Sequence, residues 1–265
     1  MGTRLDITAW HPSVAGIEEV FHAHFADHAY PSHTHDAWTL LIVDDGLVRY
    51  DLDRHEHGAL REAVTLLPPG VPHDGRTVRP EGFRKRVLYL DRTVLDAGLV
   101  GAAVDQPSLA DPLLRTRVHR LHEVLTRRTE DLEAASRLAF VAERLAGHLR
   151  PRAEPVPATG RTTAHRLREL LDARLPGGVP LDKAAATLGA HPASLVRAFS
   201  REFGIPPHRY LTGCRLELAR RHLLAGHPAA EAATLAGFYD QAHLTRHFTR
   251  HLGIGPARYG LRSGG

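Results

Sequence analysis

Between residues 37 and 90, short apolar stretches alternate with clusters of turn-forming residues. The stretches are rich in Val, Leu, Thr and Tyr, and they are interrupted by Asp-Asp-Gly at 44–46, Pro-Pro-Gly at 68–70 and Pro-Glu-Gly at 80–82. Short strands separated by turn signals of this kind are typical of antiparallel sheets. This part of the chain is therefore predicted to form an antiparallel β-barrel or sandwich.

From residue 93 to residue 149 the spacing of apolar residues changes to that of a helix. Apolar residues recur at intervals of three and four, which places them on one helical face. The rows are Leu114, Val118, Leu121 and Leu125, followed by Leu132, Ala135, Ala139, Ala142 and Leu145. Two helices are expected to close the first domain. The row at Leu114, Val118 and Leu121 is equally consistent with burial inside the chain and with a dimer interface.

A proline-containing segment separates this part from the rest of the chain. Prolines at positions 151, 155 and 157 prevent a helix and keep the backbone extended. We therefore expect a first domain over 1–150, a linker over 151–163 and a second domain over 164–265. Any signal between the domains should pass through their contact or through dimer geometry, because no continuous helix connects them.

The second domain repeats itself. A short apolar row that ends in glycine, at 181–189, returns 48 residues later at 229–237, and a second row at 195–210 returns at 244–259. Each unit predicts two short helices joined by a glycine-containing turn, which is the helix-turn-helix arrangement. Residues 207–225 are expected to form one longer helix that holds the two units at a fixed separation.

The second predicted helix of each unit carries arginines away from its apolar row. These are Arg197 and Arg201 in the first unit and Arg246 and Arg250 in the second. Arginine on a recognition helix can bind a guanine edge through two hydrogen bonds, and arginine further along the helix can contact phosphate. Neighbouring side chains supply further donors for phosphates and base edges: Ser194, Ser200, Arg209, Gln241, His243 and Thr245.

The charge distribution favours a polyanionic partner for the second domain. Residues 161–265 contain 15 Arg and Lys against 7 Asp and Glu, whereas the whole chain has a net charge of only +4. Such a field attracts nucleic acid or another polyanion. The single cysteine, Cys214, argues against a disulfide scaffold and a thiolate zinc site, and neither an export signal nor an 18-residue apolar stretch is present. We expect a cytoplasmic protein that does not contact a membrane.

Five short motifs in the second domain together form a recognisable pattern. They are Arg-Ala-Phe at 197–199, Phe-Gly-Ile-Pro-Pro-His-Arg-Tyr at 203–210, Arg-Leu-Glu-Leu-Ala-Arg-Arg-His-Leu-Leu at 215–224, Ala-Gly-Phe at 236–238 and His-Leu-Thr-Arg-His-Phe at 243–248. With these motifs, residues 181–259 resemble the DNA-binding domain of AraC/XylS-type transcriptional regulators. The resemblance implies base-facing positions at Ala193, Val196, Arg197, Gln241, Ala242, His243, Thr245 and Arg246.

The sequence departs from this pattern at two places. Pro180 stands where a serine or threonine helix cap is usual, so a capping hydrogen bond is expected to be missing. Ala229 and Ala232 replace larger aliphatic residues, so the second unit should have a thinner core. We therefore expect the second unit to be the less stable of the two in the absence of DNA.

Histidines in the first domain suggest a binding site. His33 and His35 lie two positions apart, which puts them on one side of a strand, and His73 could complete a facial set of imidazole ligands. No carboxylate follows His35 where metal-binding cupins carry their glutamate, since residues 38–40 are Trp, Thr and Leu. The pattern resembles the cupin sensor domain of AraC-type regulators, which often keeps its histidines without a metal. We expect no metal or other cofactor, and a pocket for a small organic effector lined by His33, His35, Trp38, Tyr50 and His73.

Three functions are consistent with these patterns. The favoured one is a ligand-responsive transcriptional regulator without catalytic residues. Its expected partners are promoter DNA, a small effector, a second copy of the chain if it dimerises, and RNA polymerase if it is an activator. The second is a DNA-binding repressor whose first domain is only structural or dimerising. The third is a cupin metalloenzyme, against which the missing carboxylate and the DNA-binding half both argue.

Overall fold

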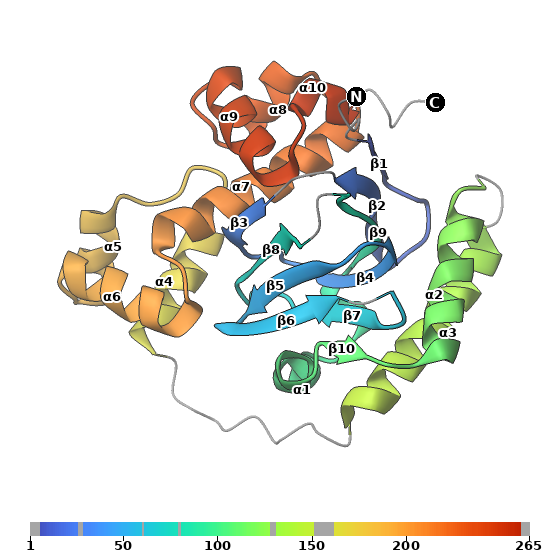
Figure 1. The fold of residues 1–265 in the computed structure, drawn as a ribbon. Helices are drawn as coiled ribbons and strands as arrows, with labels where there is room; N and C mark the ends of the chain where they lie inside the picture. The colour runs from blue at the N-terminus through green and yellow to red at the C-terminus, as the bar shows by residue number, and fades with distance from the viewer. Residues whose placement is uncertain are drawn as a thin grey trace.

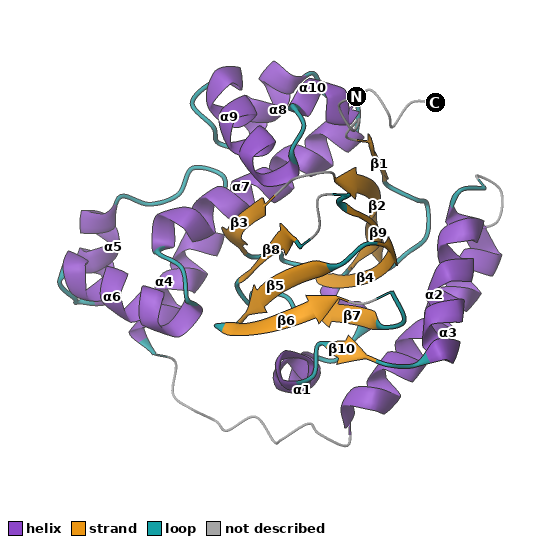
Figure 2. Ribbon diagram, in the orientation of Figure 1, coloured by secondary structure: helices purple, strands orange, loops and turns teal. Residues whose placement is uncertain are grey.

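The computed structural model describes residues 6–25, 29–59, 61–78, 81–127, 131–150 and 162–260. In this part of the chain, a β-rich half lies between a helical pair on one side and a helical half on the other (Figure 1). Figure 2 shows the strands at the centre and helices on both flanks. The predicted fold class, a strand-rich first half followed by an all-helical second half, is confirmed. Residues 151–161 of the predicted linker lie outside the described residues, and the domain boundary stays a prediction.

The β-rich half consists of two antiparallel sheets. The six-stranded sheet has the order β1-β2-β9-β4-β7-β10, and the four-stranded sheet has the order β3-β8-β5-β6. The strands are β1 (Asp6–Trp10), β2 (Ile17–Phe25), β3 (Ala29–His33), β4 (Trp38–Asp45), β5 (Val48–Leu52), β6 (His55–Ala59), β7 (Val64–Leu67), β8 (His73–Thr77), β9 (Phe83–Leu90) and β10 (Ser108–Leu109). The two sheets face each other and form the predicted barrel-like half.

The alternation of side chains along β4 divides the interior into two cores. Trp38 and Leu40 lie on the outer face of the six-stranded sheet, where they pack with α2 (Pro112–Leu125) and α3 (Asp131–Leu149). Leu41 lies on the opposite face and points into the barrel. Neighbouring residues of β4 therefore belong to different cores.

The apolar row of α2 lies inside the chain. Leu114, Val118 and Leu121 are completely buried in the outer core. The dimer-interface interpretation is therefore wrong for these three residues, because the sheet and α3 already cover their side chains. The first half also contains α1 (Val100–Asp105) and two 3₁₀ turns, Arg92–Val94 and Ala97–Leu99.

The helical half contains the two units predicted from the repeat. They are α5 (Leu181–Leu188) with α6 (Pro192–Phe203), and α8 (Ala229–Leu235) with α9 (Gln241–Leu252), joined by α7 (Pro207–Leu224). Gly204 and Gly253 end the second helix of each unit with φ of 70° and 75°, a backbone region that glycine adopts without steric cost. Pro180 precedes α5 without a side-chain cap, as expected. The sequence did not predict α4 (Thr163–Asp172) or α10 (Pro256–Gly260).

The two units pack differently. The first unit shares a small core with α4, in which Phe199 is completely buried. The core of the second unit, which contains Phe248 and the short side chains of Ala229 and Ala232, is continuous with the apolar interior of the barrel. The barrel thus supplies part of the packing for this thin core. Among the described residues, no helix combines the length and hydropathy needed to cross a bilayer.

Candidate effector cavity and nucleic-acid interface

A cavity lies between the barrel and the helical half. The inner faces of both sheets form its walls, while Gly213, Leu216, Glu217 and Arg220 of α7 and the end of α9 cover it. Its volume is about 60 Å³, which corresponds to roughly four to six water molecules at 10–15 Å³ each. A molecule that fills this cavity would therefore contact both the β-rich half and the helical half.

Four of the five predicted effector residues line this cavity. His33, His35, Tyr50 and His73 face into it from the strands and loops of the barrel. Trp38 does not, and this part of the prediction is wrong. Its side chain lies on the outer face of the sheet because neighbouring strand residues alternate, and position 38 has the same parity as the residues that pack on α2 and α3.

The three histidines meet at one end of the cavity. One ring nitrogen from each of His33, His35 and His73 lies within 4.8 Å of the others. Burial, reinforced by the neighbouring imidazoles, lowers the pKa of His33 far below its usual value and the pKa of His73 to about 3. Both rings are therefore neutral at physiological pH.

A buried charge network connects the barrel to α7. Arg220, only 2% exposed, donates from Nη2 to Glu19 Oε1 of β2 at 2.5 Å and from Nη1 to Glu217 Oε1 at 2.9 Å. The Tyr259 hydroxyl accepts from Arg220 Nε at 3.1 Å and donates to Glu19. The guanidinium also lies 4.3 Å from the ring centroid of Tyr89. Although burial opposes its charge, the two carboxylates raise the pKa of Arg220 further above its usual value.

Glu217 links this network to the histidines. Its Oε1 lies 2.8 Å from His35 Nδ1 as well as beside Arg220. Burial raises the pKa of Glu217, but Arg220 and His35 together lower it well below its usual range, so the carboxylate is ionised. His35 and Glu217 also line a second hollow of about 290 Å³ between the halves, bordered by Arg92, Asp172 and Arg221.

A second cation, half-buried, faces the cavity. Lys85 of β9 lies with Nζ 4.4 Å from the ring centroid of Tyr30. Burial, assisted by the charge of Arg220, lowers the pKa of Lys85 to about 7. This amine can therefore bind an anion when protonated, and it changes charge near neutral pH.

Sequence reasoning missed the charged residues of the cavity, although some signals were present. Lys85 lies at the same two-residue spacing as Phe83, Val87 and Tyr89 on β9. This spacing alone places its side chain with theirs on the inner face of the strand. Arg220 lies one turn after Leu216 on the buried face of α7. No local pattern shows that Glu19, about two hundred residues earlier in the chain, is the partner of Arg220.

Most predicted DNA-contacting side chains lie at the surface of α6 and α9. Ala193, Ser194, Arg197, Arg201, Gln241, Ala242, Arg246 and Arg250 are exposed, while Val196, Ser200, His243 and Thr245 are half-buried. Asp240 caps α9 by accepting a hydrogen bond from the His243 backbone N–H at 2.6 Å, and Arg197 donates to Ser194 Oγ at 3.2 Å. The residues therefore remain candidates for nucleic-acid contact.

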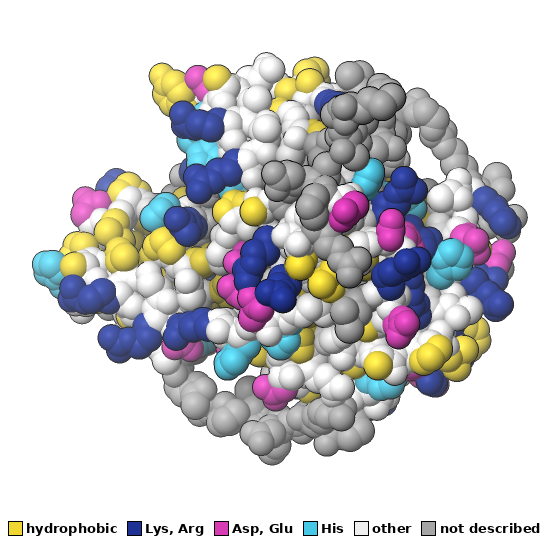
Figure 3. Space-filling view, in the orientation of Figure 1, with side chains coloured by type: hydrophobic (Ala, Val, Ile, Leu, Met, Phe, Trp, Pro, Cys, Tyr) yellow, Lys and Arg dark blue, Asp and Glu magenta, His cyan; other side chains and the backbone are white. Residues whose placement is uncertain are grey.

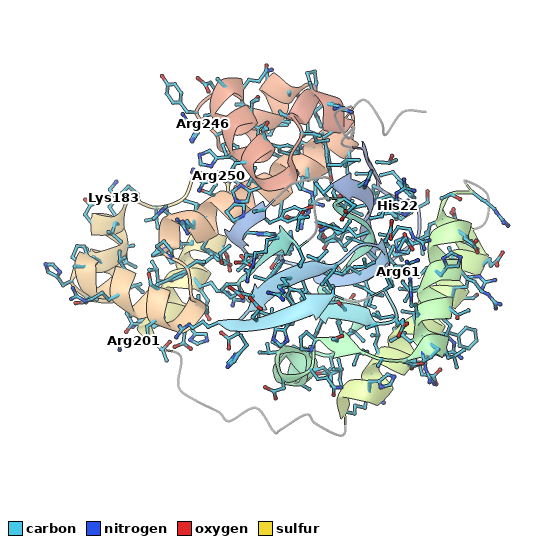
Figure 4. The ribbon with its side chains drawn as sticks, viewed as in Figure 1. His22, Arg61, Lys183, Arg201, Arg246 and Arg250 are labelled. Carbon is cyan, nitrogen blue, oxygen red and sulfur yellow. The ribbon has the colours of Figure 1, made fainter. Side chains whose placement is uncertain are left out.

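The arginines do not all point the same way. In Figure 4, Arg246 and Arg250 project from α9 on the side of Lys183 in α5, whereas Arg201 lies at the opposite end of the first unit. There the carbonyl oxygen of Arg201 accepts a hydrogen bond from Arg54 of the barrel. Figure 3 shows Lys and Arg side chains along the edge formed by the two units.

Two family descriptions match this chain, one in each half. Residues 16–140 match the AraC-like ligand binding domain, and residues 184–262 match a helix-turn-helix domain. Together the two matches support an AraC-type regulator, with a ligand-binding domain in the first half and a helix-turn-helix domain in the second. The chain is also similar to the probable transcriptional regulator LumQ of Photobacterium leiognathi, with 36% identity over 62 residues. That alignment covers 23% of the chain and 25% of LumQ.

Solved structures show the same arrangement of the two halves. A crystal structure of ToxT from Vibrio cholerae O395 matches 99% of this chain and 98% of its own, with a TM-score of 0.61 and 10% identity. A structure of ToxT from strain SCE256 bound to an unsaturated fatty acid matches 98% of this chain and 96% of its own, with a TM-score of 0.58 and 10% identity. At this identity the similarity establishes the fold.

Proposed function

We propose that this chain is a sequence-specific DNA-binding transcriptional regulator, and that a small carboxylate-bearing effector in the barrel cavity changes its affinity for DNA. The observation that carries the proposal is the cover of the cavity, which α7 and α9 of the helix-turn-helix half provide. An effector can shift the protein only by binding one arrangement of the halves better than another. A ligand that contacts both halves meets this requirement directly. The chain acts by binding, with no catalytic step.

Lys85 favours an anionic effector. Its amine faces the cavity, whereas the charge of Arg220 is already balanced by Glu19 and Glu217. ToxT has been crystallised with a fatty acid, which carries a carboxylate. The present cavity volume of about 60 Å³ suits a short-chain acid. A longer acid requires the helical cover to move outward.

Effector binding should depend on the charge of Lys85. Since its pKa is about 7, a carboxylate should stabilise the protein more at pH 6.5 than at pH 8.5, because the amine loses its proton in between. Thermal unfolding with a series of carboxylates of increasing chain length measures this, with the matched amides as neutral controls. Lys85→Met should abolish the response, whereas Lys183→Met, at the only other lysine, should retain it. An equal response to acids and amides would contradict an anionic effector.

DNA recognition is assigned to α6 and α9. Because α7 fixes their separation, we propose that these helices enter successive major grooves, roughly 34 Å apart. Arg197 and Arg246 are proposed to read bases. Arg201 and Arg250 are proposed to contact phosphates, and their removal should reduce the salt dependence of binding.

Replacing Arg197 or Arg246 by alanine should weaken binding to the cognate site by about 1–3 kcal/mol. The loss should be concentrated at one base position of the site, because each arginine is expected to contact one base pair. Affinity measured on the cognate duplex and on its single-base variants tests this assignment. Arg120→Ala, at an exposed position of α2, is the control and should leave affinity unchanged. Equal weakening on every duplex would identify a phosphate contact instead.

A further inference from the structure

The three histidines of the cavity share one hydrogen-bonding arrangement. His33 Nδ1 lies 2.8 Å from the Pro31 carbonyl oxygen, and His73 Nδ1 lies 3.1 Å from the Val71 carbonyl oxygen. His35 Nδ1 lies 2.8 Å from the carboxylate of Glu217. Carbonyl and carboxylate oxygens only accept, so each Nδ1 carries the proton. In a neutral ring the lone pair is then on Nε2.

The free nitrogens converge on one point. The Nε2 atoms of His33 and His35 are 3.1 Å apart, and one ring nitrogen of each of the three histidines lies within 4.8 Å of the others. Two lone pairs at this distance repel each other unless a proton or a metal ion lies between them. Nitrogens bound to a tetrahedral zinc ion at 2.0–2.1 Å are about 3.3 Å apart. The His33–His35 pair already has nearly this spacing, and adjustment of the other separations, each at most 4.8 Å, would complete a coordination site.

We propose that His33, His35 and His73 bind one divalent transition-metal ion, and that Glu217 of α7 is the outer partner that orients His35. Imidazole ligands suit zinc, nickel, iron and copper, whereas calcium and magnesium require oxygen ligands. A histidine ligand commonly donates its second N–H to a carboxylate or a backbone carbonyl, which fixes its tautomer and orientation. All three rings have such a partner here. The proposal replaces the expectation, drawn from the missing glutamate, that this site holds no metal.

The arrangement connects the metal to the DNA-binding half. Of the three outer partners, the carbonyls of Pro31 and Val71 belong to the barrel, but Glu217 belongs to α7. Two carboxylates, Glu19 and Glu217, oppose the nearby positive charge of Arg220. Three protein ligands leave at least one coordination position open, and the cavity has room there for water or for an anionic group.

Metal binding can be measured on the full-length protein without DNA or an organic effector. The chain is first stripped with a chelator, and Zn²⁺ binding is measured by calorimetry and Co²⁺ binding by visible absorption. One site per chain is expected, with the Co²⁺ bands of a nitrogen-rich, low-coordinate site. Because neither readout uses DNA, a failure here leaves the proposed regulatory function standing. Failure of DNA binding, equally, leaves the metal site standing.

Variants identify the ligands. His73→Ala and the more conservative His73→Gln should each lower Zn²⁺ affinity by at least about 100-fold, and Glu217→Gln should lower it by about 10- to 100-fold. His55→Ala, at an exposed histidine of β6, should leave affinity and stoichiometry unchanged. Circular dichroism of each stripped variant shows whether it is folded. Absence of a stoichiometric site in the unmodified chain would overturn the proposal, and so would Co²⁺ bands that persist in a folded His73 variant.

Discussion

Replacing Arg220 by methionine should destabilise the protein by about 3–5 kcal/mol, since it leaves the buried Glu19 and the partly buried Glu217 without their cation. The lost contacts join β2 to α7, so the second unit should separate from the barrel before the barrel itself unfolds. Urea unfolding followed by far-UV circular dichroism measures the total loss. Hydrogen exchange of the amides in α7 and β2 shows where the structure opens first.

Arg221 provides the matched control. It is the next residue on α7 and pairs with Glu18 across the same boundary at 3.1 Å, but its side chain is 50% exposed. Arg221→Met should therefore cost less than about 1 kcal/mol. Adding Glu19→Gln and Glu217→Gln to Arg220→Met should recover part of the lost stability, because the charges that lost their partner are then removed. Equal losses at Arg220 and Arg221 would contradict the assignment of a buried connection between the halves.

Replacing Phe248 or Phe199 by alanine should cost about 3–5 kcal/mol in either unit, because both rings are completely buried. The two variants should increase hydrogen exchange in different parts of the structure. Phe248 belongs to the core shared with the barrel, whereas Phe199 belongs to the separate core of the first unit and α4. Phe248→Ala should therefore increase hydrogen exchange in β2 and β9 as well as in α9. Phe199→Ala should confine the increase to α4, α5 and α6.

An exposed phenylalanine serves as the control for these two variants. Phe140 of α3 is 56% exposed, and Phe140→Ala should change stability by no more than about 0.5 kcal/mol. If the barrel strands exchanged equally in the Phe199 and Phe248 variants, the second unit would not be the one that is coupled to the barrel.

The helical half was the most predictable part of the molecule. The repeat predicts the helices of both units, because the same spacing of apolar residues and glycines occurs twice. Each occurrence supports the interpretation of the other. The helices over 181–188 and 241–252 lie where the pattern predicts them. Local spacing carries this information because a helix-turn-helix unit is formed by residues close together in the chain.

The site was less predictable because its geometry depends on contacts between distant segments. His33 and His35 both line the cavity, but β3 ends at His33, so the same-strand spacing does not account for the position of His35. The inward side of β4 is decided by the helices that cover its other face, and Trp38 therefore lies outside the cavity. The contact of His35 with Glu217 joins residues 182 positions apart. No pattern within either half specifies it, and the cover of the cavity follows only from the packing of the halves.

The proposal that both units read DNA is tested most directly by selecting bound duplexes from a random pool with the full-length chain. The expected result is one enriched, non-palindromic motif with two parts, whose centres lie about one helical turn apart. Repeating the selection with Arg246→Ala should relax a position in one part and leave the other part unchanged. Failure to enrich any motif would contradict sequence-specific recognition, and a motif confined to one groove would contradict the assignment of both α6 and α9 to the DNA.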